Sequence, residues 1–569
     1  MMNVQELINC WLAQPLPSYL AEELTTIACD ELAIEDRFYQ YISFGTGGMR
    51  GLLGAGTNRI NIYTIRRVAE GLARYIESSG EEAKQRGVVL AYDTRHFSYE
   101  FACETASVLG VHGIRSYIYK EARPTPQLSF TVRKLNAYAG VVITASHNPK
   151  QYNGFKVYGE DGAQLTPDFA NEIIYYMNEI KDIFAIKVEE LALLEQQGYI
   201  TWLASDLDKE YLTSLLTLKS NQDVALNMNI VYTPLHGAGL VPVSEGLRAF
   251  GFQQVHIVEQ QAVQDGEFPT VAYPNPEESN AFELAMKLGN QVGADLLLAT
   301  DPDADRLGVA VKSDDSYKLL TGNQLGALLL NYILSTKQQL GSLPQNAVML
   351  KTIVTSELGA HIAEKYDVAT VNTLTGFKYI AEKIAEYERT GEYSYLFGYE
   401  ESYGYLIETF VRDKDAVQVA LKVAEMAAYY ETQGHTLLDQ LDNLYKEYGY
   451  HNEALLSQQF EGKNGQTEMQ VMLQRLRDNM PKKIVNLTVL RTEDYLIGQA
   501  VLANGTIEGL TLPKENVVKL ILEDGSWIAI RPSGTEPKCK FYIGVVGETA
   551  EQTQQKLEQV KEAVLEIVK

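Results

Sequence analysis

Three aspartates at alternate positions carry the strongest chemical signal in the sequence. Asp301, Asp303 and Asp305 lie in the segment DPDADR, directly after the apolar run ADLLLAT. Alternate residues of an extended loop point the same way, so three carboxylates can converge there on one hard cation. An EF-hand calcium loop is excluded, because its sixth position would be Arg306 instead of Gly and its twelfth Lys312 instead of Glu. All-oxygen ligation favours Mg²⁺, and a solvated acidic turn is the alternative.

A serine follows a second apolar run. Ser146 and His147 lie in the segment TASHNP after the run GVVI, and Lys156 comes shortly afterwards. A hydroxyl that a buried strand presents beside His and Lys is a candidate nucleophile. The sequence contains no GxSxG, so the nucleophile elbow of a serine hydrolase is excluded. A turn or helix-capping serine, with a structural histidine beside it, is the alternative.

A third motif, RPSGTEP, combines groups that bind phosphate. Arg531 can hold a phosphate with two parallel hydrogen bonds, while Ser533, Gly534 and Thr535 offer hydroxyl and amide donors. The alternative is an ordinary turn built from Gly and Pro. The sequence has no Walker A motif, so we expect phosphate binding without the P-loop of an NTPase.

Two further segments could contact a sugar. Glu400 and Ser402 are two positions apart in GYEESYG, so they project to one side of an extended segment and could bind paired hydroxyls. A charged surface loop is the alternative. The turn TLTGFK, with Thr375, Gly376 and Lys378, carries little weight by itself.

The elements that must position these residues are buried strands alternating with amphipathic helices. Apolar runs that end abruptly in polar residues occur at 88–95, 139–149, 229–239, 294–306 and 347–356. Helical spacing between them predicts α/β layers with sheets buried on both faces, and ligands bind at the carboxyl ends of such strands. The last third instead has short alternating segments and an amphipathic closing helix. We expect boundaries that give four domains, 1–207, 208–322, 323–450 and 451–569.

Composition limits the classes of partner. The 569 residues include 49 Lys and Arg against 74 Asp and Glu, a formal charge of −25 that disfavours nucleic acid and anionic membranes. The four cysteines are scattered, without CxxC, so we expect neither a structural zinc site nor a disulfide framework. The longest apolar stretch is shorter than the ~20 residues of a membrane span. These features predict a cytoplasmic protein.

The motifs TASHNP, DPDADR, EES and RPSGT, in this order, resemble those of the α-D-phosphohexomutases. Within that family the chain is similar to the branch that depends on glucose 1,6-bisphosphate. The resemblance extends from FGTGGMRG at 44–51 to RPSGTEPK at 531–538. It implies an α/β fold of four domains around a central cleft, with three similar α/β domains with mixed sheets and a distinct α+β C-terminal domain.

The resemblance also implies a role for each motif. Ser146 would be the phosphoserine, and its phosphate would hold Mg²⁺ together with Asp301, Asp303 and Asp305. The implied catalytic residues are Ser146, His147, Lys156, Arg50 and Lys414. The implied substrate-binding residues are Arg306, Lys351, Thr375, Gly376, Lys378, Glu400, Ser402, Arg531, Ser533, Gly534 and Thr535.

One loop departs from the family pattern. Members whose sugar loop reads GExSGH use its histidine for proton transfer, whereas here Tyr403 and Gly404 stand at its last two positions. Lys414, in the segment RDKD, matches the phosphoglucomutase branch and is our candidate for proton transfer.

The implied reaction interconverts α-D-glucose 1-phosphate and D-glucose 6-phosphate, with Mg²⁺ as cofactor and glucose 1,6-bisphosphate as activator and intermediate. The alternatives are a phosphomannomutase or phosphopentomutase with the same mechanism, a Mg²⁺-dependent sugar phosphatase with Asp301 or Asp303 as nucleophile, and a sugar-phosphate sensor. We expect small sugar phosphates as partners, no nucleic acid or membrane, and a monomer or weak homodimer.

Overall fold

The computed structural model divides the chain into two compact units. Unit 1 comprises Met1–Leu325, Phe377–Glu392 and Leu396–Gly434, and unit 2 comprises Gly326–Gly376, Tyr393–Tyr395 and His435–Lys569. The structure describes residues 4–45, 47–221, 224, 226–460, 465–532 and 538–567. Among these residues, no helix is long and apolar enough to cross a membrane.

Unit 1 begins with a six-stranded mixed sheet in the order β1-β5-β4-β2-β3-β6. Its strands are β1 (Gly48–Leu52), β2 (Val88–Tyr92), β3 (Ser116–Tyr119), β4 (Ala139–Ile143), β5 (Tyr152–Tyr158) and β6 (Ile200–Leu203). The strands β4, β2, β3 and β6 are parallel, while β5 runs antiparallel to both β4 and β1. Every residue of β2 and β4 is buried, as their continuous apolar runs predict.

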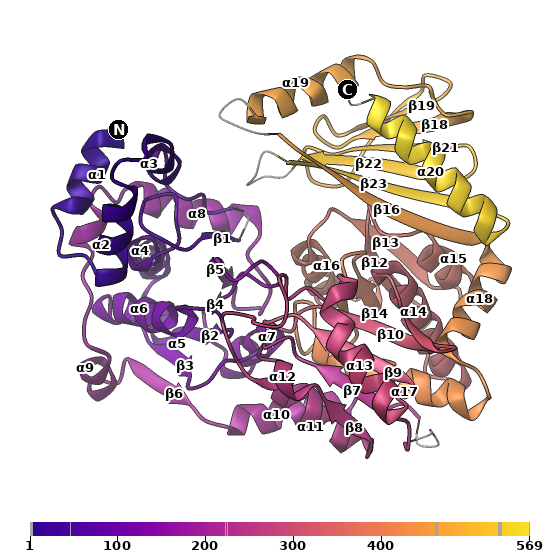
Figure 1. The fold of residues 1–569 in the computed structure, drawn as a ribbon, viewed down its shortest axis with the longest axis horizontal. Helices are drawn as coiled ribbons and strands as arrows, with labels where there is room; N and C mark the ends of the chain where they lie inside the picture. Colours follow the sequence, from indigo (N-terminus) through magenta and orange to yellow (C-terminus); the bar gives the residue numbers. More distant parts are fainter. Residues whose placement is uncertain are drawn as a thin grey trace. The chain divides into compact units, whose positions relative to one another are not determined.

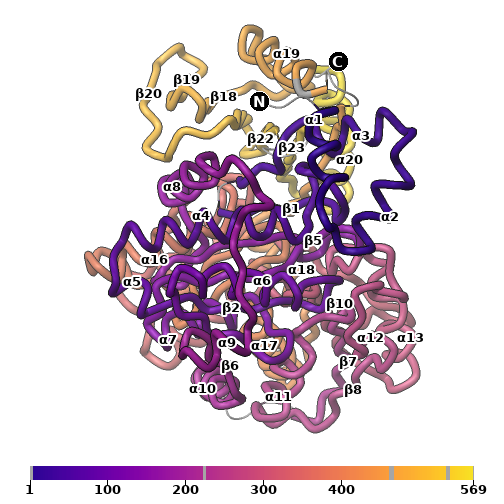
Figure 2. Tube along the Cα trace, turned by 90° about the vertical axis from the view of Figure 1, so that its left-hand side faces the viewer, coloured from indigo at the N-terminus to yellow at the C-terminus, as the bar shows by residue number. Residues whose placement is uncertain are grey.

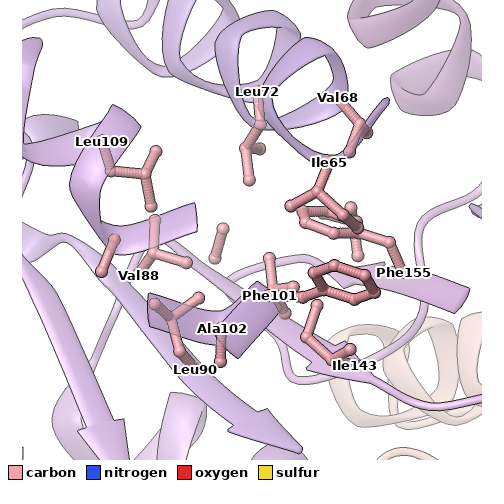
Figure 3. Close-up of a cluster of buried hydrophobic side chains, with 14 of the residues drawn as sticks. Ile65, Val68, Leu72, Val88, Leu90, Phe101, Ala102, Leu109, Ile143 and Phe155 are labelled. Atoms are coloured by element: carbon pink, nitrogen blue, oxygen red, sulfur yellow. The ribbon is translucent and has the colours of Figure 1, made fainter. Parts of the chain in front are cut away.

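Helices cover both faces of this sheet. On one face, α4 (Ile62–Ser78) and α6 (Ser98–Val111) pack against each other and against the strands. Figure 3 shows Ile65, Val68 and Leu72 of α4 meeting Phe101 of α6 and Phe155 of β5. On the other face, α7 (Thr125–Leu135) packs on β2 and β4. The remaining helices here are α5 (Glu81–Arg86), α8 (Pro167–Asn178), η1 (Ile183–Ala185) and α9 (Leu191–Gln196).

Three N-terminal helices lie beside α4 (Figure 1). They are α1 (Val4–Leu12), α2 (Ser18–Ile27) and α3 (Glu31–Phe38). Trp11 of α1 is nearly fully buried and meets Phe38, Tyr63 and Phe184 edge to face. This aromatic cluster attaches the N-terminal helices to the first sheet's helical layer.

The second sheet of unit 1 has five strands in the order β11-β10-β9-β7-β8. They are β7 (Ile230–Thr233), β8 (Val255–Ile257), β9 (Leu296–Thr300), β10 (Leu307–Ser313) and β11 (Ser316–Leu319). β8, β7 and β9 are parallel, and β10 and β11 continue antiparallel. The helices of this region are α10 (Asp206–Leu216), α11 (Leu240–Phe250), α12 (Glu259–Ala262), η2 (Ser279–Phe282), α13 (Glu283–Val292) and α17 (Ala416–Thr432). Figures 1 and 2 both show α11 beside α10, and α11 packs against both α10 and α17.

Unit 1 also contains α16 (Phe377–Thr390) and the end of a short antiparallel pair. In this pair β14 (Ser394–Tyr399) meets β15 (Tyr405–Leu406), with Gly398 opposite Leu406. The pair is joined by the segment that carries Glu400 and Ser402, so both residues lie in the tight connection at the end of β14.

Unit 2 combines a parallel strand pair with an antiparallel sheet. The parallel strands are β12 (Ala347–Thr352) and β13 (Ala369–Thr373), and the helices of this part are α14 (Gly322–Gln339), α15 (Leu358–Lys365) and α18 (Leu437–Tyr448). The antiparallel sheet has the order β16-β23-β22-β21-β18-β19-β20, with β17 paired to β18. Its strands are β16 (Tyr450–Gln459), β17 (Lys483–Ile484), β18 (Leu487–Asp494), β19 (Gln499–Leu502), β20 (Ile507–Gly509), β21 (Val518–Leu522), β22 (Trp527–Pro532) and β23 (Lys538–Gly547).

The closing helix α20 (Ala550–Ile567) runs along this antiparallel sheet (Figure 1). Leu557, Val560 and Val564 are buried in one core with strand residues and with α19 (Gly465–Asp478). The apolar face expected from the sequence is therefore the packed face. The mixed sheets and the distinct C-terminal sheet confirm the predicted fold class, while the four domain boundaries stay predictions.

Candidate active site

The aspartates of DPDADR lie in the connection between β9 and β10. Asp301, Asp303 and Asp305 are buried, and ligand oxygens of all three lie within 4.8 Å of one another. The turn is held by its own first carboxylate, because the backbone amides of Asp305 and Arg306 donate to Asp301 Oδ1 at 3.1 and 3.0 Å. The predicted convergence of three carboxylates is confirmed, which excludes a solvated turn.

Two lysines and one threonine surround the aspartates. Lys156 Nζ lies 3.0 Å from Asp303 Oδ2, and Lys414 Nζ lies 3.1 Å from Asp305 Oδ2. Thr125 Oγ1 donates to Asp303 Oδ2 at 2.8 Å. These contacts leave Asp303 Oδ1 and Asp305 Oδ1 buried without a hydrogen-bond partner. Because buried carboxylate oxygens require compensation, this donor set fits a hard divalent cation such as Mg²⁺.

Burial and mutual repulsion separate the pKa values of these carboxyl groups. Burial, Asp303 and Asp305 raise the pKa of Asp301 well above its ordinary value. For Asp303, burial raises the pKa, but Lys156 and the hydrogen bond from Thr125 outweigh burial and lower it. A cation would relieve the repulsion that raises the pKa of Asp301.

Ser146 faces the first aspartate across the two sheets of unit 1. It follows β4, whereas Asp301 follows β9, and Ser146 Oγ donates to Asp301 Oδ2 at 2.6 Å. Ser146 is buried and has a left-handed φ of 51°, a conformation that is uncommon for a residue with a side chain. Its Oγ also lies 3.2 Å from His147 Nδ1. The serine is therefore aimed at the acidic cluster.

The basic groups around Ser146 differ in protonation. Burial and the charges of Arg306, Arg50, Arg95 and Lys156 lower the pKa of His147 well below its ordinary value, so His147 is neutral at neutral pH. Burial also lowers the pKa of Lys156, but Asp303 and Asp305 more than offset it. The site thus presents a protonated Lys156 beside a neutral imidazole, an environment suited to phosphate oxygens.

The sugar-binding candidates lie against the metal-binding candidates. Arg306 forms an isolated bridge with Gly404, and Leu307 N donates to Tyr403 O at 3.1 Å. Glu400 is buried and Ser402 is half-buried in the same connection. Glu400 is also one of the groups that raise the pKa of Lys414, together with Asp305 and Asp413, against the effect of burial. The carboxylate and the protonated lysine share one environment.

Gly404 explains the departure from the GExSGH pattern. A Cβ at this position would lie 2.1 Å from Lys414 Cδ and 3.4 Å from Glu400 Oε2. The lysine side chain therefore passes directly over the residue that stands where the family pattern has histidine. Only glycine leaves room for it.

Arg50 and Arg306 complete the basic candidates of unit 1. Arg50 is exposed on β1, where it pairs with Gly154 of β5, the strand that carries Lys156. Arg306 forms an ion pair with Glu277. Lys378, at the start of α16, is buried, with its Nζ 4.9 Å from the centre of the Tyr379 ring. Of these residues, Arg50 and Arg306 are among the charges acting on His147.

The other candidates lie in unit 2. Lys351 is fully buried, and its Nζ lies 3.0 Å from Glu357 Oε1, which also accepts a hydrogen bond from Lys519 at 3.4 Å. Thr375 and Gly376 precede α16, and Gly376 has a φ of 119°. Arg531, at the end of β22, lies 3.2 Å from Glu515. Ser533, Gly534 and Thr535 lie outside the described residues.

The sequence analysis missed residues that support the site from behind. Asp93 and Arg95 follow β2 and contact the Ser146 loop, and Tyr158 donates to Asp413 Oδ2 at 2.7 Å, beside Lys414. Thr125 holds Asp303. Asp93 and Arg95 end the apolar run at 88–95, so the rule that ligand-binding residues follow buried strands could have found them.

Comparison with known proteins matches most of the chain to one family. Models of the phosphoglucomutase/phosphomannomutase family match in order: α/β/α domain I at residues 41–183, domain II at 209–314, domain III at 321–448, and the C-terminal domain at 484–566. A curated phosphoglucomutase of Staphylococcus epidermidis is 41% identical over 506 residues, covering 89% of this chain and 90% of the relative. One of Staphylococcus aureus (strain USA300) is 39% identical over 516 residues, covering 90% and 91%.

Solved structures share the fold at lower identity. The open form of parafusin, a phosphoglucomutase from Paramecium, matches with a TM-score of 0.66 at 18% identity, covering 93% of this chain and 95% of that one. A phosphoglucomutase/phosphomannomutase family protein from Burkholderia thailandensis matches with a TM-score of 0.65 at 17% identity, covering 92% and 98%. The chain belongs to the phosphoglucomutase/phosphomannomutase family, within the α-D-phosphohexomutases. The resemblance drawn from the four motifs is confirmed.

Proposed function

We propose that this chain is a phosphoglucomutase that interconverts α-D-glucose 1-phosphate and D-glucose 6-phosphate through a phosphoserine at Ser146. The observation that carries the proposal is the hydrogen bond of 2.6 Å from Ser146 Oγ to Asp301 Oδ2. It joins the candidate phosphoryl carrier to three buried carboxylates that suit a divalent cation. Curated phosphoglucomutases at about 40% identity over most of the chain support glucose as the sugar.

The basic residues support a phosphoryl group on Ser146. A serine phosphate carries about −1.5 to −2 charges, which the cations around His147 would balance. Mg²⁺ held by Asp301, Asp303 and Asp305 would neutralise charge as the phosphoryl group moves. Lys156 and Arg306 would bind the phosphoryl oxygens, and the neutral His147 would accept a hydrogen bond near Oγ. Such positioning and charge stabilisation supply most of the catalysis in phosphoryl transfer.

The reaction requires two half-reactions at one serine. In the first, the bond from phosphorus to Ser146 Oγ breaks and a bond from phosphorus to a sugar hydroxyl forms, while the hydroxyl gives up its proton and Ser146 Oγ takes up a proton in exchange. Lys414 is our candidate for exchanging that proton. The product, glucose 1,6-bisphosphate, then turns over and returns its other phosphoryl group to Ser146.

The reorientation requires groups that accept the sugar either way round. Glu400 and Ser402 would bind its hydroxyls in both orientations. Arg531, with Ser533, Gly534 and Thr535, would hold whichever phosphate is not reacting, since one phosphate is always distant from the serine. Arg50, Lys351, Thr375, Gly376 and Lys378 would bind the remaining substrate groups.

The test is conversion of glucose 1-phosphate to glucose 6-phosphate, measured with and without Mg²⁺ and trace glucose 1,6-bisphosphate. Mannose 1-phosphate and ribose 1-phosphate run in parallel, and free phosphate is monitored. We expect Mg²⁺-dependent, bisphosphate-stimulated formation of glucose 6-phosphate without phosphate release. Faster turnover of mannose or ribose phosphate would overturn the choice of sugar, and stoichiometric phosphate release would indicate a phosphatase.

A further inference from the structure

The buried side chain of Arg95 binds the backbone of the loop that carries Ser146. Arg95, three residues after the end of β2, donates from Nη1 to the carbonyl oxygens of Pro149 and Tyr152 at 2.8 and 3.2 Å. Its Nη2 donates to the carbonyl oxygens of Ser146 and Asn148. A single guanidinium thus binds four carbonyl groups within seven residues of chain, 146–152. The planar fork of arginine suits such a task better than the single ammonium of lysine.

The backbone of Ser146 is held on both sides of its Cα. Ser146 N donates to Thr144 Oγ1 at 2.8 Å, and Thr144 Oγ1 donates to Asp93 Oδ2 at 2.6 Å. Asp93 Oδ2 lies 3.3 Å from Arg95 Nε, and Arg95 returns to the carbonyl oxygen of Ser146. These contacts close a ring around the serine. Because a left-handed φ costs free energy in a residue with a side chain, it persists only where surrounding contacts impose it.

The guanidinium of Arg95 also packs against the connection between α12 and η2. Arg95 Cζ lies 4.9 Å from the centre of the Phe268 ring, and both residues are almost completely buried. The chain segment of Phe268 leads to Glu277, the partner of Arg306. Arg95 therefore connects the Ser146 loop to the part of unit 1 that carries the acidic cluster.

We propose that Arg95 is a positioning residue that holds Ser146 Oγ toward Asp301 for phosphoryl transfer. This inference rests on the proposed role of Ser146 as the phosphoryl carrier. The N–H groups of the Arg95 guanidinium donate to backbone carbonyl groups. Its loss should therefore misplace the serine without removing any group assigned to bind the sugar phosphate. Its removal should therefore lower kcat much more than it changes KM.

The test is Arg95→Lys, which keeps the positive charge but cannot reach the four carbonyl groups at once. A misplacement of about 1 Å at a reacting group costs about 100-fold in rate, so we expect kcat to fall by about that factor. We expect KM for glucose 1-phosphate to stay within about threefold. Rapid-quench transfer of phosphate from labelled Ser146 to glucose 1-phosphate should slow by the same factor as kcat. A folded Arg95→Lys with kcat within about twofold of the wild type would overturn the proposal.

Two further variants separate positioning from stability. Arg66→Lys is the matched control, because Arg66 lies on α4 in the same unit, where it pairs with Glu104 and lies over the Tyr63 ring. We expect wild-type kcat from it. Phe268→Leu keeps apolar volume but removes the ring under Arg95, and decides the matter if Arg95→Lys does not fold. It should lower kcat by about tenfold with KM little changed, whereas wild-type kcat would contradict the positioning role.

The failure of this inference can be told from that of the proposed function. If the wild-type chain neither carries phosphate on Ser146 nor converts glucose 1-phosphate, the proposed function fails. If the wild type does both, and Arg95→Lys and Phe268→Leu equal it, only the role of Arg95 fails.

Discussion

At the residue scale, the two lysines of the site lie at different carboxylates. Lys156 forms an ion pair with Asp303. Lys414 forms an ion pair with Asp305, and Glu400 also raises its pKa. Both lysines are buried among carboxylates that raise their pKa values against the effect of burial. The two cations therefore stay protonated at neutral pH, and of the two it is Lys414 whose pKa is raised by Glu400.

Lys414→Met tests the assignment of proton transfer. The substitution keeps most of the side-chain volume and removes the proton donor, so we expect kcat to fall by about 10²- to 10⁴-fold. The measurement is steady-state conversion of glucose 1-phosphate. Lys446→Met is the control, because Lys446 pairs with Asp442 on the surface of α18 and should leave kcat unchanged. A Lys414→Met enzyme with wild-type kcat would remove Lys414 from the mechanism.

Gly404→Ala tests the same lysine without changing it. The new methyl group would lie 2.1 Å from Lys414 Cδ, so the lysine must move away from the sugar loop. We expect kcat to fall by about 10- to 100-fold, because small displacements of a reacting group are costly. Gly509→Ala is the control, since nothing lies within 4 Å of a Cβ there. Unchanged kcat in Gly404→Ala would contradict the close packing of Lys414.

At the element scale, the end of each buried strand supplies one part of the site. β4 leads to Ser146, β9 to Asp301, β14 to Glu400, and β2 to Asp93 and Arg95. The strands β2, β4 and β9 could be predicted from the sequence, because the apolar runs at 88–95, 139–149 and 294–306 end in polar residues. The hydrogen bonds of Arg95 to four carbonyl groups could not be predicted from the sequence, because every residue has a backbone carbonyl and no sequence pattern marks the ones that bind. Nor could the approach of Lys414 over Gly404, which depends on how two loops pack.

Asp415 caps the N-terminus of α17, directly after Lys414, and its pKa can be tested by experiment. Asp415 Oδ1 accepts hydrogen bonds from Val417 N and Gln418 N, and Tyr211 donates to Oδ2 at 2.8 Å. Burial raises its pKa to about 6, despite these hydrogen bonds. Because the pKa of the folded state lies above that of the unfolded state, the contribution of Asp415 to stability is fully present below about pH 4 and is lost as the pH rises through 6.

Asp415→Asn should remove the pH-dependent loss of stability that Asp415 causes, while its side-chain oxygen still caps the helix. We expect the free energy of unfolding of Asp415→Asn, relative to wild type, to rise between about pH 4 and pH 7 and then level off. Urea unfolding of both proteins across this range is the measurement. Asp439→Asn is the control of opposite sign, because hydrogen bonds from Thr436 lower the pKa of Asp439 at the start of α18. A difference that does not vary with pH would show that folding does not raise the pKa of Asp415.

At the scale of the whole molecule, this acidic chain has several cations in unit 1 together with Ser146 and the aspartates. The formal charge of −25 disfavours anionic ligands over the surface as a whole, yet Lys156, Lys414, Arg50, Arg95 and Arg306 all lie in unit 1 with Ser146 and the aspartates. Screening beyond about 8 Å lets such a local cluster determine what binds. Composition alone could not predict this, whereas four motifs in fixed order predicted both the family and the chemistry.

The central claim is that Ser146 carries the phosphoryl group between the two ends of the sugar. The most direct measurement incubates the protein with ³²P-labelled glucose 1,6-bisphosphate, locates the label by peptide mapping, and follows its transfer to unlabelled glucose 1-phosphate. We predict label on Ser146 that chases into sugar phosphate at the rate of turnover. Ser146→Ala should take up no label and show no mutase activity, with unchanged thermal unfolding. Substantial mutase activity in folded Ser146→Ala, or label on an aspartate of DPDADR instead, would contradict the account.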